Sequence, residues 1–334
     1  MQSQRQDMTN STPKPDLQAP IFIVGHARSG TTLLATMLGR HPNISATPET
    51  HFFNEGRFAL KPHYPRGAAT VARRISTTRL RHLEFDDSAL TALLQPAPMT
   101  DSGVITALLS AYLARSGKAR VAEKTPVHIR HIDDILTCLP HAKIIWIQRD
   151  GRACIASLRK VDWATHDIAA LSRQWTRNMG FGLAAQRQHP NAILTTRYEN
   201  LTSNPKAELT RILAWLAEPF SPTTLDTSQE VTTISQAEEN WKANVRKPIL
   251  SDRAEAWRTE LTASQIAAAE AIMGSMLRRL GYDAPARTGI KAAGETLRQT
   301  LQNSPLGVAL QKRLFNRMAR KRFAPWGANR GTKG

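Results

Sequence analysis

The chain has 334 residues, of which 41% are hydrophobic and 22% are charged, and its 18 glycines and 19 prolines are scattered along it. This composition is typical of a globular protein that can bury a core, and it excludes a low-complexity chain. The length suffices for one large α/β domain or two modest ones. The two cysteines, Cys138 and Cys154, are too few for a disulfide framework and lack metal-ligand spacing, which indicates reduced thiols in a cytoplasmic protein.

The net charge of +18 is concentrated at the C-terminal end. Residues 284–334 contain eleven lysines and arginines and one acidic residue, a net charge of +10, which leaves +8 for residues 1–283. Apolar residues recur between these basic positions in a loosely amphipathic pattern that is interrupted at Pro305. Such a basic, partly helical tail can lie on an anionic membrane surface, bind nucleic acid or remain a solvated appendage.

The N-terminal end differs in composition from the basic C-terminal tail. Residues 1–19 are polar and indicate a disordered leader that lacks the apolar stretch of a signal peptide. No stretch approaches 18 consecutive apolar residues, so no transmembrane helix is expected.

The first predicted elements, a strand at 21–24 and a helix at 31–39, are joined by a loop rich in glycine and hydroxyl groups. This layout directs backbone N–H groups and a helix N-terminus at an anion. The loop nearly matches the nucleotide pattern G-x-x-x-x-G-K-[ST], but Thr31 occupies the lysine position, and Arg28 supplies a bidentate cation. The simpler alternative is a tight turn eased by Gly30. The N–H groups expected to bind a 5′-phosphate are those of Ser29, Gly30, Thr31 and Thr32.

The next predicted elements are a short strand at 44–46, which leads to Glu49, and an irregular helical segment at 54–118. Further strands are predicted at 120–123, 143–148 and 192–196. Helices are predicted at about 128–139, from 151 to about 158, at about 168–189 and from 198 to about 217. Strands separated by helices predict an α/β fold with a parallel sheet that helices cover on both faces.

Conspicuous polar residues follow the predicted strands, namely the first loop, Lys124, Arg149 and Tyr198. Because ligands bind at the carboxyl ends of parallel strands, these residues are expected to meet on one rim of the sheet. Ser157 follows Arg149 by about two helical turns, which predicts a second anion site. Taken alone this second motif is weak, since an Arg149–Asp150 ion pair and a surface serine explain it equally well.

Together these motifs resemble those of PAPS-dependent sulfotransferases, enzymes whose donor is 3′-phosphoadenylyl sulfate. Residues 28–33 resemble the 5′-phosphosulfate loop of that family, and residues 145–157 resemble its 3′-phosphate motif. The likeness is strongest to the tyrosylprotein sulfotransferase-like branch and runs in the same order from about residue 19 to 283. It implies a P-loop-like three-layer domain at 20–283, in which 54–118 is a helical acceptor-side insertion. Further matching positions are 48–50, Lys124, 198–201, 246–248, Trp257 and 279–283.

The resemblance also implies roles for individual residues. Arg28 and Lys124 would flank the sulfuryl group, and Glu49 would be the general base. His51 is the competing base, because histidine has that role in other sulfotransferase branches. No metal is expected, and a proline-started helix explains His128, His131, Asp133 and Asp134 better than a metal cluster does. Arg149 and Ser157 would hold the 3′-phosphate, with Tyr198 and Lys247 against the nucleotide.

The sequence therefore predicts a cytoplasmic sulfotransferase, with its tail a candidate for peripheral contact with the inner face of the membrane. Its acceptor would be a hydroxyl of a carbohydrate, a lipid-linked saccharide or a peptide tyrosine. The alternatives are a P-loop kinase or NTPase, against which Thr31 speaks, and a basic nucleic-acid-binding protein, for which no recognition motif is present. The acceptor and the oligomeric state stay open.

Overall fold

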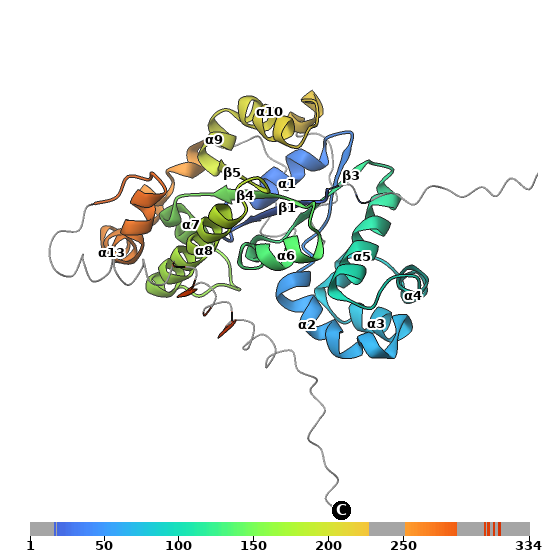
Figure 1. Cartoon of the computed structure of the whole chain (residues 1–334). Coiled ribbons are helices and arrows are strands. Elements are labelled where there is room, and N and C mark those ends of the chain that lie inside the picture. Colours follow the sequence, from blue (N-terminus) through green and yellow to red (C-terminus); the bar gives the residue numbers. More distant parts are fainter. Residues whose placement is uncertain are drawn as a thin grey trace, which may run out of the picture.

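The computed structural model describes residue 17, residues 19–226 and 251–285, and positions 304, 306, 307, 310, 313 and 314. The described strands form one parallel sheet in the order β2-β3-β1-β4-β5, with helices around it (Figure 1). The strands are β1 (Ile21–Gly25), β2 (Ile44–Ala46), β3 (Arg120–Lys124), β4 (Lys143–Gln148) and β5 (Ile193–Arg197). Each lies within one residue of its predicted bounds.

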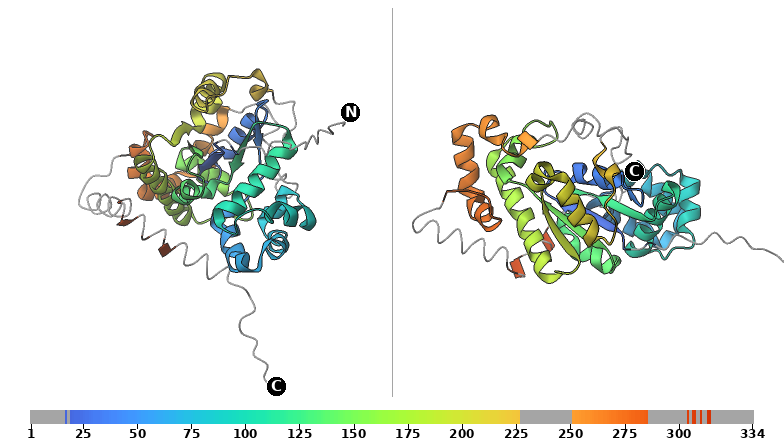
Figure 2. Two further views of the ribbon diagram at one scale, coloured as in Figure 1. Left: turned by 45° about the vertical axis from the view of Figure 1, so that its right-hand side comes forward. Right: turned by 90° about the horizontal axis from the view of Figure 1, so that it is seen from above.

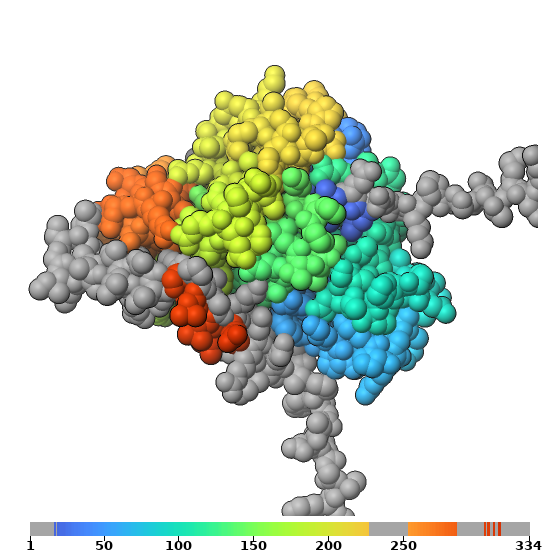
Figure 3. All heavy atoms as spheres, viewed as in Figure 1, coloured from blue at the N-terminus to red at the C-terminus, as the bar shows by residue number. Residues whose placement is uncertain are grey.

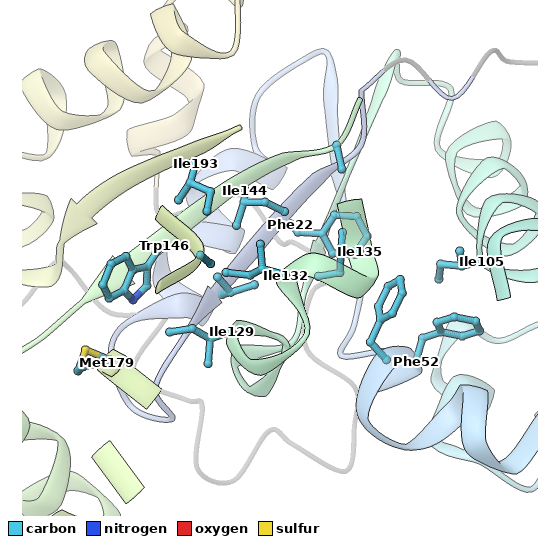
Figure 4. Packing of buried hydrophobic residues seen from close by; sticks show 14 of the residues in the cluster. Phe22, Phe52, Ile105, Ile129, Ile132, Ile135, Ile144, Trp146, Met179 and Ile193 are labelled. Carbon is cyan, nitrogen blue, oxygen red and sulfur yellow. The ribbon is translucent and has the colours of Figure 1, made fainter. Parts of the chain in front are cut away.

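Strands β1 and β4, in the middle of the sheet, read as near-continuous apolar runs because both faces of the sheet are buried there. Successive residues of β1 point to opposite faces, so Phe22 belongs to one buried cluster and Ile23 to the other. In Figure 4, Phe22, Ile144, Trp146 and Ile193 of the strands lie against isoleucines of the chain that follows β3. Two cores separated by one sheet make a three-layer α/β domain, which confirms the predicted fold class.

The helices divide between these two cores. Helices α1, α9 and α10 contribute to the cluster that contains Ile23, and α6, α7, α8 and α13 contribute to the cluster that contains Phe22. The helix bounds are α1 (Thr31–Gly39), α2 (Arg57–Leu60), α3 (Ala68–Ile75), α4 (Asp87–Leu94), α5 (Asp101–Ser116), α6 (Ile132–Cys138), α7 (Gly151–Leu158), α8 (Ile168–Gln188), α9 (Tyr198–Ser203), α10 (Pro205–Trp215), α12 (Trp257–Glu260) and α13 (Ala263–Arg279).

The segment between β2 and β3 begins with the π-helical turn η1 (Phe52–Gly56), continues through short helices and ends in the 16-residue α5. The views in Figure 2 place these helices at one end of the sheet and α13 at the other. In the space-filling view they form a continuous lobe beside α6 (Figure 3). The hydroxyl of Tyr112 on α5 donates to the carbonyl of Ala46 at 3.2 Å, which ties this lobe to β2.

Two helices that were predicted to be continuous are each divided into two helical segments in the structure. The helix expected at 128–139 is a 3₁₀ turn η4 (Pro126–Arg130) followed by α6, because His131 leaves helical geometry with φ −126° and ψ 18°. The helix expected from 198 to 217 breaks at Asn204, since Pro205 lacks an N–H and disfavours helical geometry in the residue before it. Among the residues that the structure describes, no helix combines the length and apolar character needed to cross a bilayer.

Candidate active site

The loop between β1 and α1 has the geometry of an anion cradle. Arg28 and Gly30 have positive φ angles of 68° and 91°, and the N–H of Ser29 bonds to the carbonyl of His26 at 3.1 Å. Among the described residues no side chain caps the start of α1, so the N–H groups of its first turn point out of the helix end. Tyr198 packs against Gly30 so closely that a Cβ there would lie 2.4 Å from Tyr198 Cδ2.

The second predicted motif lies directly against this loop. Nε of Arg28 donates to Oγ of Ser157 on α7 at 3.0 Å, although the two residues are 129 positions apart. Burial lowers the pKa of Arg28, and the neighbouring Arg149 lowers it further. Ser29 contributes its side chain to packing, with Oγ 3.5 Å from the sulfur of buried Cys154, whose pKa is raised to about 12 by burial.

Arg149 at the end of β4 is held over the same loop. Its guanidinium donates to the backbone carbonyls of Arg28 at 2.7 Å and Arg253 at 2.6 Å, and it lies 4.0 Å from the centre of the Tyr198 ring. Its Nε is buried and has no hydrogen-bond partner within the described part of the chain. The alternative of an Arg149–Asp150 ion pair is wrong, because Asp150 pairs with Arg152 at 2.7 Å.

Lys124 and Glu49 meet beside the loop, at the end of β3. The Lys124 side chain is fully buried, and its Nζ lies 2.6 Å from Glu49 Oε1. The other carboxylate oxygen of Glu49 lies 3.1 Å from Nε2 of His51. The two residues predicted to compete as general base are therefore in direct contact. Arg79, which begins the 3₁₀ turn η3 (Arg79–Leu83), reaches the same His51 nitrogen at 2.9 Å.

A buried hydrogen-bond network around Glu123, which the sequence analysis did not predict, supports the pair of Lys124 and Glu49. Glu123, one residue before Lys124, accepts hydrogen bonds from the hydroxyls of Thr50 at 2.8 Å and Thr125 at 2.5 Å. Nδ1 of His128 donates to it at 3.0 Å, and Nε2 of His128 accepts from the N–H of Phe53 at 3.2 Å. Burial alone would raise the pKa of Glu123, but His128 and the two threonines outweigh it and lower this pKa. A carboxylate inside an otherwise buried strand is the sequence signal for such a network.

The predicted site residues of β1, β3, β4, α7 and α9 thus meet at the carboxyl edge of the sheet. Lys247 lies outside the described residues. The model of the sulfotransferase family matches residues 20–222, more than half of the chain. The chain belongs to the sulfotransferase family. This sulfotransferase is accordingly an enzyme that transfers a sulfuryl group from PAPS, which decides against the P-loop kinase or NTPase and the nucleic-acid-binding protein.

Relatives and solved structures agree with this assignment. Protein-tyrosine sulfotransferase 1 of Danio rerio is 26% identical, over 79% of this chain and 72% of its own length. Nodulation protein NoeE of Sinorhizobium fredii is 25% identical, over 78% of this chain and 65% of its own length. The fold is similar to that of the sulfotransferase domain of the Synechococcus PCC 7002 olefin synthase, with a TM-score of 0.54 and 24% identity over 81% of this chain and 98% of that one. The sulfotransferase domain from the curacin biosynthetic pathway gives a TM-score of 0.57 and 20% identity over 80% and 99%.

The groups at the sheet edge fit a donor with phosphate at both ends. The first turn of α1 offers N–H groups for one anion, and Arg149 offers a buried Nε for another. The tight contact between Gly30 and Tyr198 leaves room for the loop backbone but for no side chain at position 30.

Proposed function

We propose that the sulfotransferase uses Glu49, Arg28 and Lys124 to move a sulfuryl group in line from PAPS to an acceptor hydroxyl. The observation that carries this proposal is the 2.6 Å contact between Lys124 Nζ and Glu49 Oε1. It lies at the end of β3, the strand paired with β1, whose loop carries Arg28. We infer that a base and two cations surround the sulfuryl group during transfer.

In this mechanism Glu49 takes the proton of the acceptor hydroxyl as its oxygen attacks sulfur. A bond forms between sulfur and the acceptor oxygen, the bond from sulfur to the 5′-phosphate oxygen breaks, and its electron pair stays on the nucleotide. Arg28 and Lys124 stabilise the negative charge that develops on the sulfuryl and bridging oxygens. A positioned base contributes about 10²–10⁴-fold. The mechanism includes no metal ion.

The remaining predicted residues bind the donor in this proposal. The N–H groups of residues 29–32 hold the 5′-phosphate, and Arg149 with Ser157 holds the 3′-phosphate. Support comes from the buried Nε of Arg149 and from the Arg28–Ser157 contact, which joins the two anion sites. Tyr198, on which the Arg149 guanidinium stacks, is proposed to contact the nucleotide. The same role is proposed for Lys247 from the family resemblance alone.

The acceptor is proposed to be a hydroxyl of a carbohydrate, a lipid-linked saccharide or a peptide tyrosine. The name of the Danio rerio relative favours tyrosine, but donor site and fold are shared by enzymes with different acceptors. The helical segment 54–118 is proposed to shape the acceptor pocket, because Arg79 from that segment reaches the His51–Glu49 pair.

A cytoplasmic location with peripheral membrane contact completes the proposal. The net charge of +10 in residues 284–334 supports attraction to an anionic surface, and a lipid-linked acceptor would lie on one. Contact with a membrane surface needs no spanning helix.

The test begins with donor binding and then measures transfer. Adenosine 3′,5′-bisphosphate should bind the chain more tightly than ATP does, and ³⁵S from labelled PAPS should appear in acceptors of a cell extract. Arg28→Ala and Lys124→Ala should each lower this transfer by at least about 10²-fold while the protein stays folded. Exposed Arg258 and Lys206 provide matched controls, since Arg258→Ala and Lys206→Ala remove the same side chains elsewhere. Undiminished turnover in both site variants would refute the assigned roles.

A further inference from the structure

His51 lies beside Glu49, the proposed base, and both of its ring nitrogens contact polar groups. Nδ1 lies 3.2 Å from Nδ2 of Asn54, and Nε2 lies 3.1 Å from Oε2 of Glu49 and 2.9 Å from a guanidinium nitrogen of Arg79. The backbone of His51 is left-handed, with φ 51° and ψ 23°, immediately before η1. A non-glycine residue in this conformation is costly, and such residues gather at functional sites.

The hydrogen-bond partners assign the tautomer of this ring. Nδ2 of Asn54 also faces the carboxylate of Glu55, at 3.3 Å from Oε1, so the nitrogen rather than the oxygen of the Asn54 amide points toward His51. An amide nitrogen only donates, and Nδ1 of His51 therefore accepts. The proton of the neutral ring is then on Nε2, from which it is donated to Glu49.

The contact with Arg79 does not reverse this assignment. A guanidinium only donates, so it could bond to Nε2 only in the tautomer with the proton on Nδ1. That tautomer would set the Nδ1 proton against the Asn54 amide hydrogens and the Nε2 lone pair against the Glu49 carboxylate. The tautomer with the proton on Nε2 makes two hydrogen bonds and has one contact of donor against donor, with Arg79. Its alternative makes one hydrogen bond, with Arg79, and has two contacts between like groups. Arg79 is held instead by Glu55, at 3.5 Å, and is about half exposed.

We propose that His51 is a positioning residue that acts through Glu49 and is not itself the base. This inference rests on the proposed function, in which Glu49 takes the acceptor proton. His51 holds Oε2, while Oε1 lies on Lys124, the cation proposed to stabilise the sulfuryl group. Oε1 is therefore the oxygen that receives the acceptor proton, next to the atoms that react. The ring of His51 has no lone pair left for this proton, because Asn54 occupies that of Nδ1.

The first test reads the tautomer directly in the free enzyme. Long-range ¹H–¹⁵N spectra of the full chain labelled with ¹⁵N-histidine, with His51 assigned by its loss in His51→Gln, should show a protonated Nε2 and an unprotonated Nδ1. A protonated Nδ1 would overturn the proposal. Because no donor or acceptor is present, this result is independent of whether PAPS is the substrate.

The second test compares two variants during transfer of ³⁵S from PAPS to the extract fraction that the wild-type enzyme labels. His51→Ala should lower kcat by about 10²-fold, because a misplaced base loses its geometry, with the KM for PAPS unchanged. His51→Gln keeps a side-chain N–H for Glu49 and should recover most of this loss. Equal losses in both variants would identify His51 as the base and overturn the proposal. Exposed His141, on the loop before β4, is the matched control, and His141→Ala should leave kcat unchanged.

Failure of the underlying function would be recognised separately. A wild-type chain that neither binds adenosine 3′,5′-bisphosphate nor transfers ³⁵S refutes the proposed function, whereas the spectrum still decides the state of His51. A loss of bisphosphate affinity together with kcat in His51→Ala would indicate a merely structural role and would likewise overturn the positioning role.

Discussion

At the scale of single residues, Gly30 and Tyr198 show how tightly the loop between β1 and α1 is packed. Gly30 has a φ of 91°, a conformation that costs an L-residue roughly 1–2 kcal/mol. Its missing side chain is replaced by the Tyr198 ring, which in turn lies under the Arg149 guanidinium. One glycine thus sets both the turn of the loop and the position of an aromatic ring proposed to contact the nucleotide.

Gly30→Ala should therefore lower both stability and donor affinity. Gly117 is a matched control, because its φ is 64° and no atom of the described residues lies within 4 Å of a Cβ built there. We expect Gly117→Ala to cost about 1 kcal/mol in the free energy of unfolding, from the backbone alone. Gly30→Ala should cost about 1–3 kcal/mol more, because Tyr198 must move. Urea unfolding and titration with adenosine 3′,5′-bisphosphate measure the two effects, and equal behaviour of the variants would contradict this account.

At the scale of elements, the chain that carries Glu49 is fastened to β3 by Glu123 and His128. The Glu123 carboxylate accepts hydrogen bonds from the hydroxyls of Thr50 and Thr125. Thr50 follows Glu49 in the chain and Thr125 follows Lys124, so both partners of the Glu49–Lys124 contact are held from the next residue. Glu49, the proposed base, therefore owes its position to the end of an internal strand rather than to the loop in which it lies. Sites built on strands in this way hold their groups more precisely than loops do.

Glu123→Gln should loosen this fastening. The amide replaces an acceptor oxygen with a donor among groups that all donate, so one buried donor loses its partner. We expect a loss of about 3 kcal/mol in the free energy of unfolding, as for a buried pair that is broken. Glu255→Gln is the control, since its pair with Arg258 is exposed and worth less than about 1 kcal/mol. Equal unfolding midpoints for the two variants would show that Glu123 does not hold this part of the fold.

The elements that could be predicted from the sequence are those specified by local patterns. Strands β1 and β4 have near-continuous apolar runs, and glycines lie at the ends of β1 and α1 and shortly after β4. The bounds of all five strands and of α1 agree with the structure to within one residue. The breaks at His131 and Asn204 were missed, although Pro205 is a local signal for the second. The meeting of the motifs at one edge of the sheet follows from strand order, which a parallel α/β pattern implies.

What could not be predicted are contacts between side chains far apart in the chain. The Arg28–Ser157 and Lys124–Glu49 distances depend on the packing of α7 and of the segment after β2 against the sheet. The backbone carbonyls that receive Arg149 leave no trace in the sequence either. Residue types and strand ends thus predict which residues gather at this edge of the sheet, whereas tertiary packing determines which atoms meet.

At the scale of the whole molecule, charge is divided unevenly between the domain and the tail. The C-terminal 51 residues, 284–334, have a net charge of +10, against +8 for the preceding 283. Within the described positions, Leu306, Leu310 and Leu314 are the large apolar side chains most exposed along this tail, at 81%, 58% and 52%. Their spacing of four residues places them on one side of a helix. Exposed leucines with a high positive charge are the combination that interfacial helices use.

Removal of residues 286–334 should therefore abolish binding to anionic vesicles. In flotation assays the full chain should rise with phosphatidylglycerol vesicles but not with neutral phosphatidylcholine vesicles, and less so as salt increases, because charge attraction is screened. Replacing Leu306, Leu310 and Leu314 with serine should weaken flotation without changing net charge, which separates the apolar contribution from the electrostatic one. Partition of the truncated chain equal to that of the full chain would rule out the tail as the membrane contact. Transfer activity of the truncated chain on a water-soluble acceptor should be unchanged, because the site residues that the structure describes all precede residue 286.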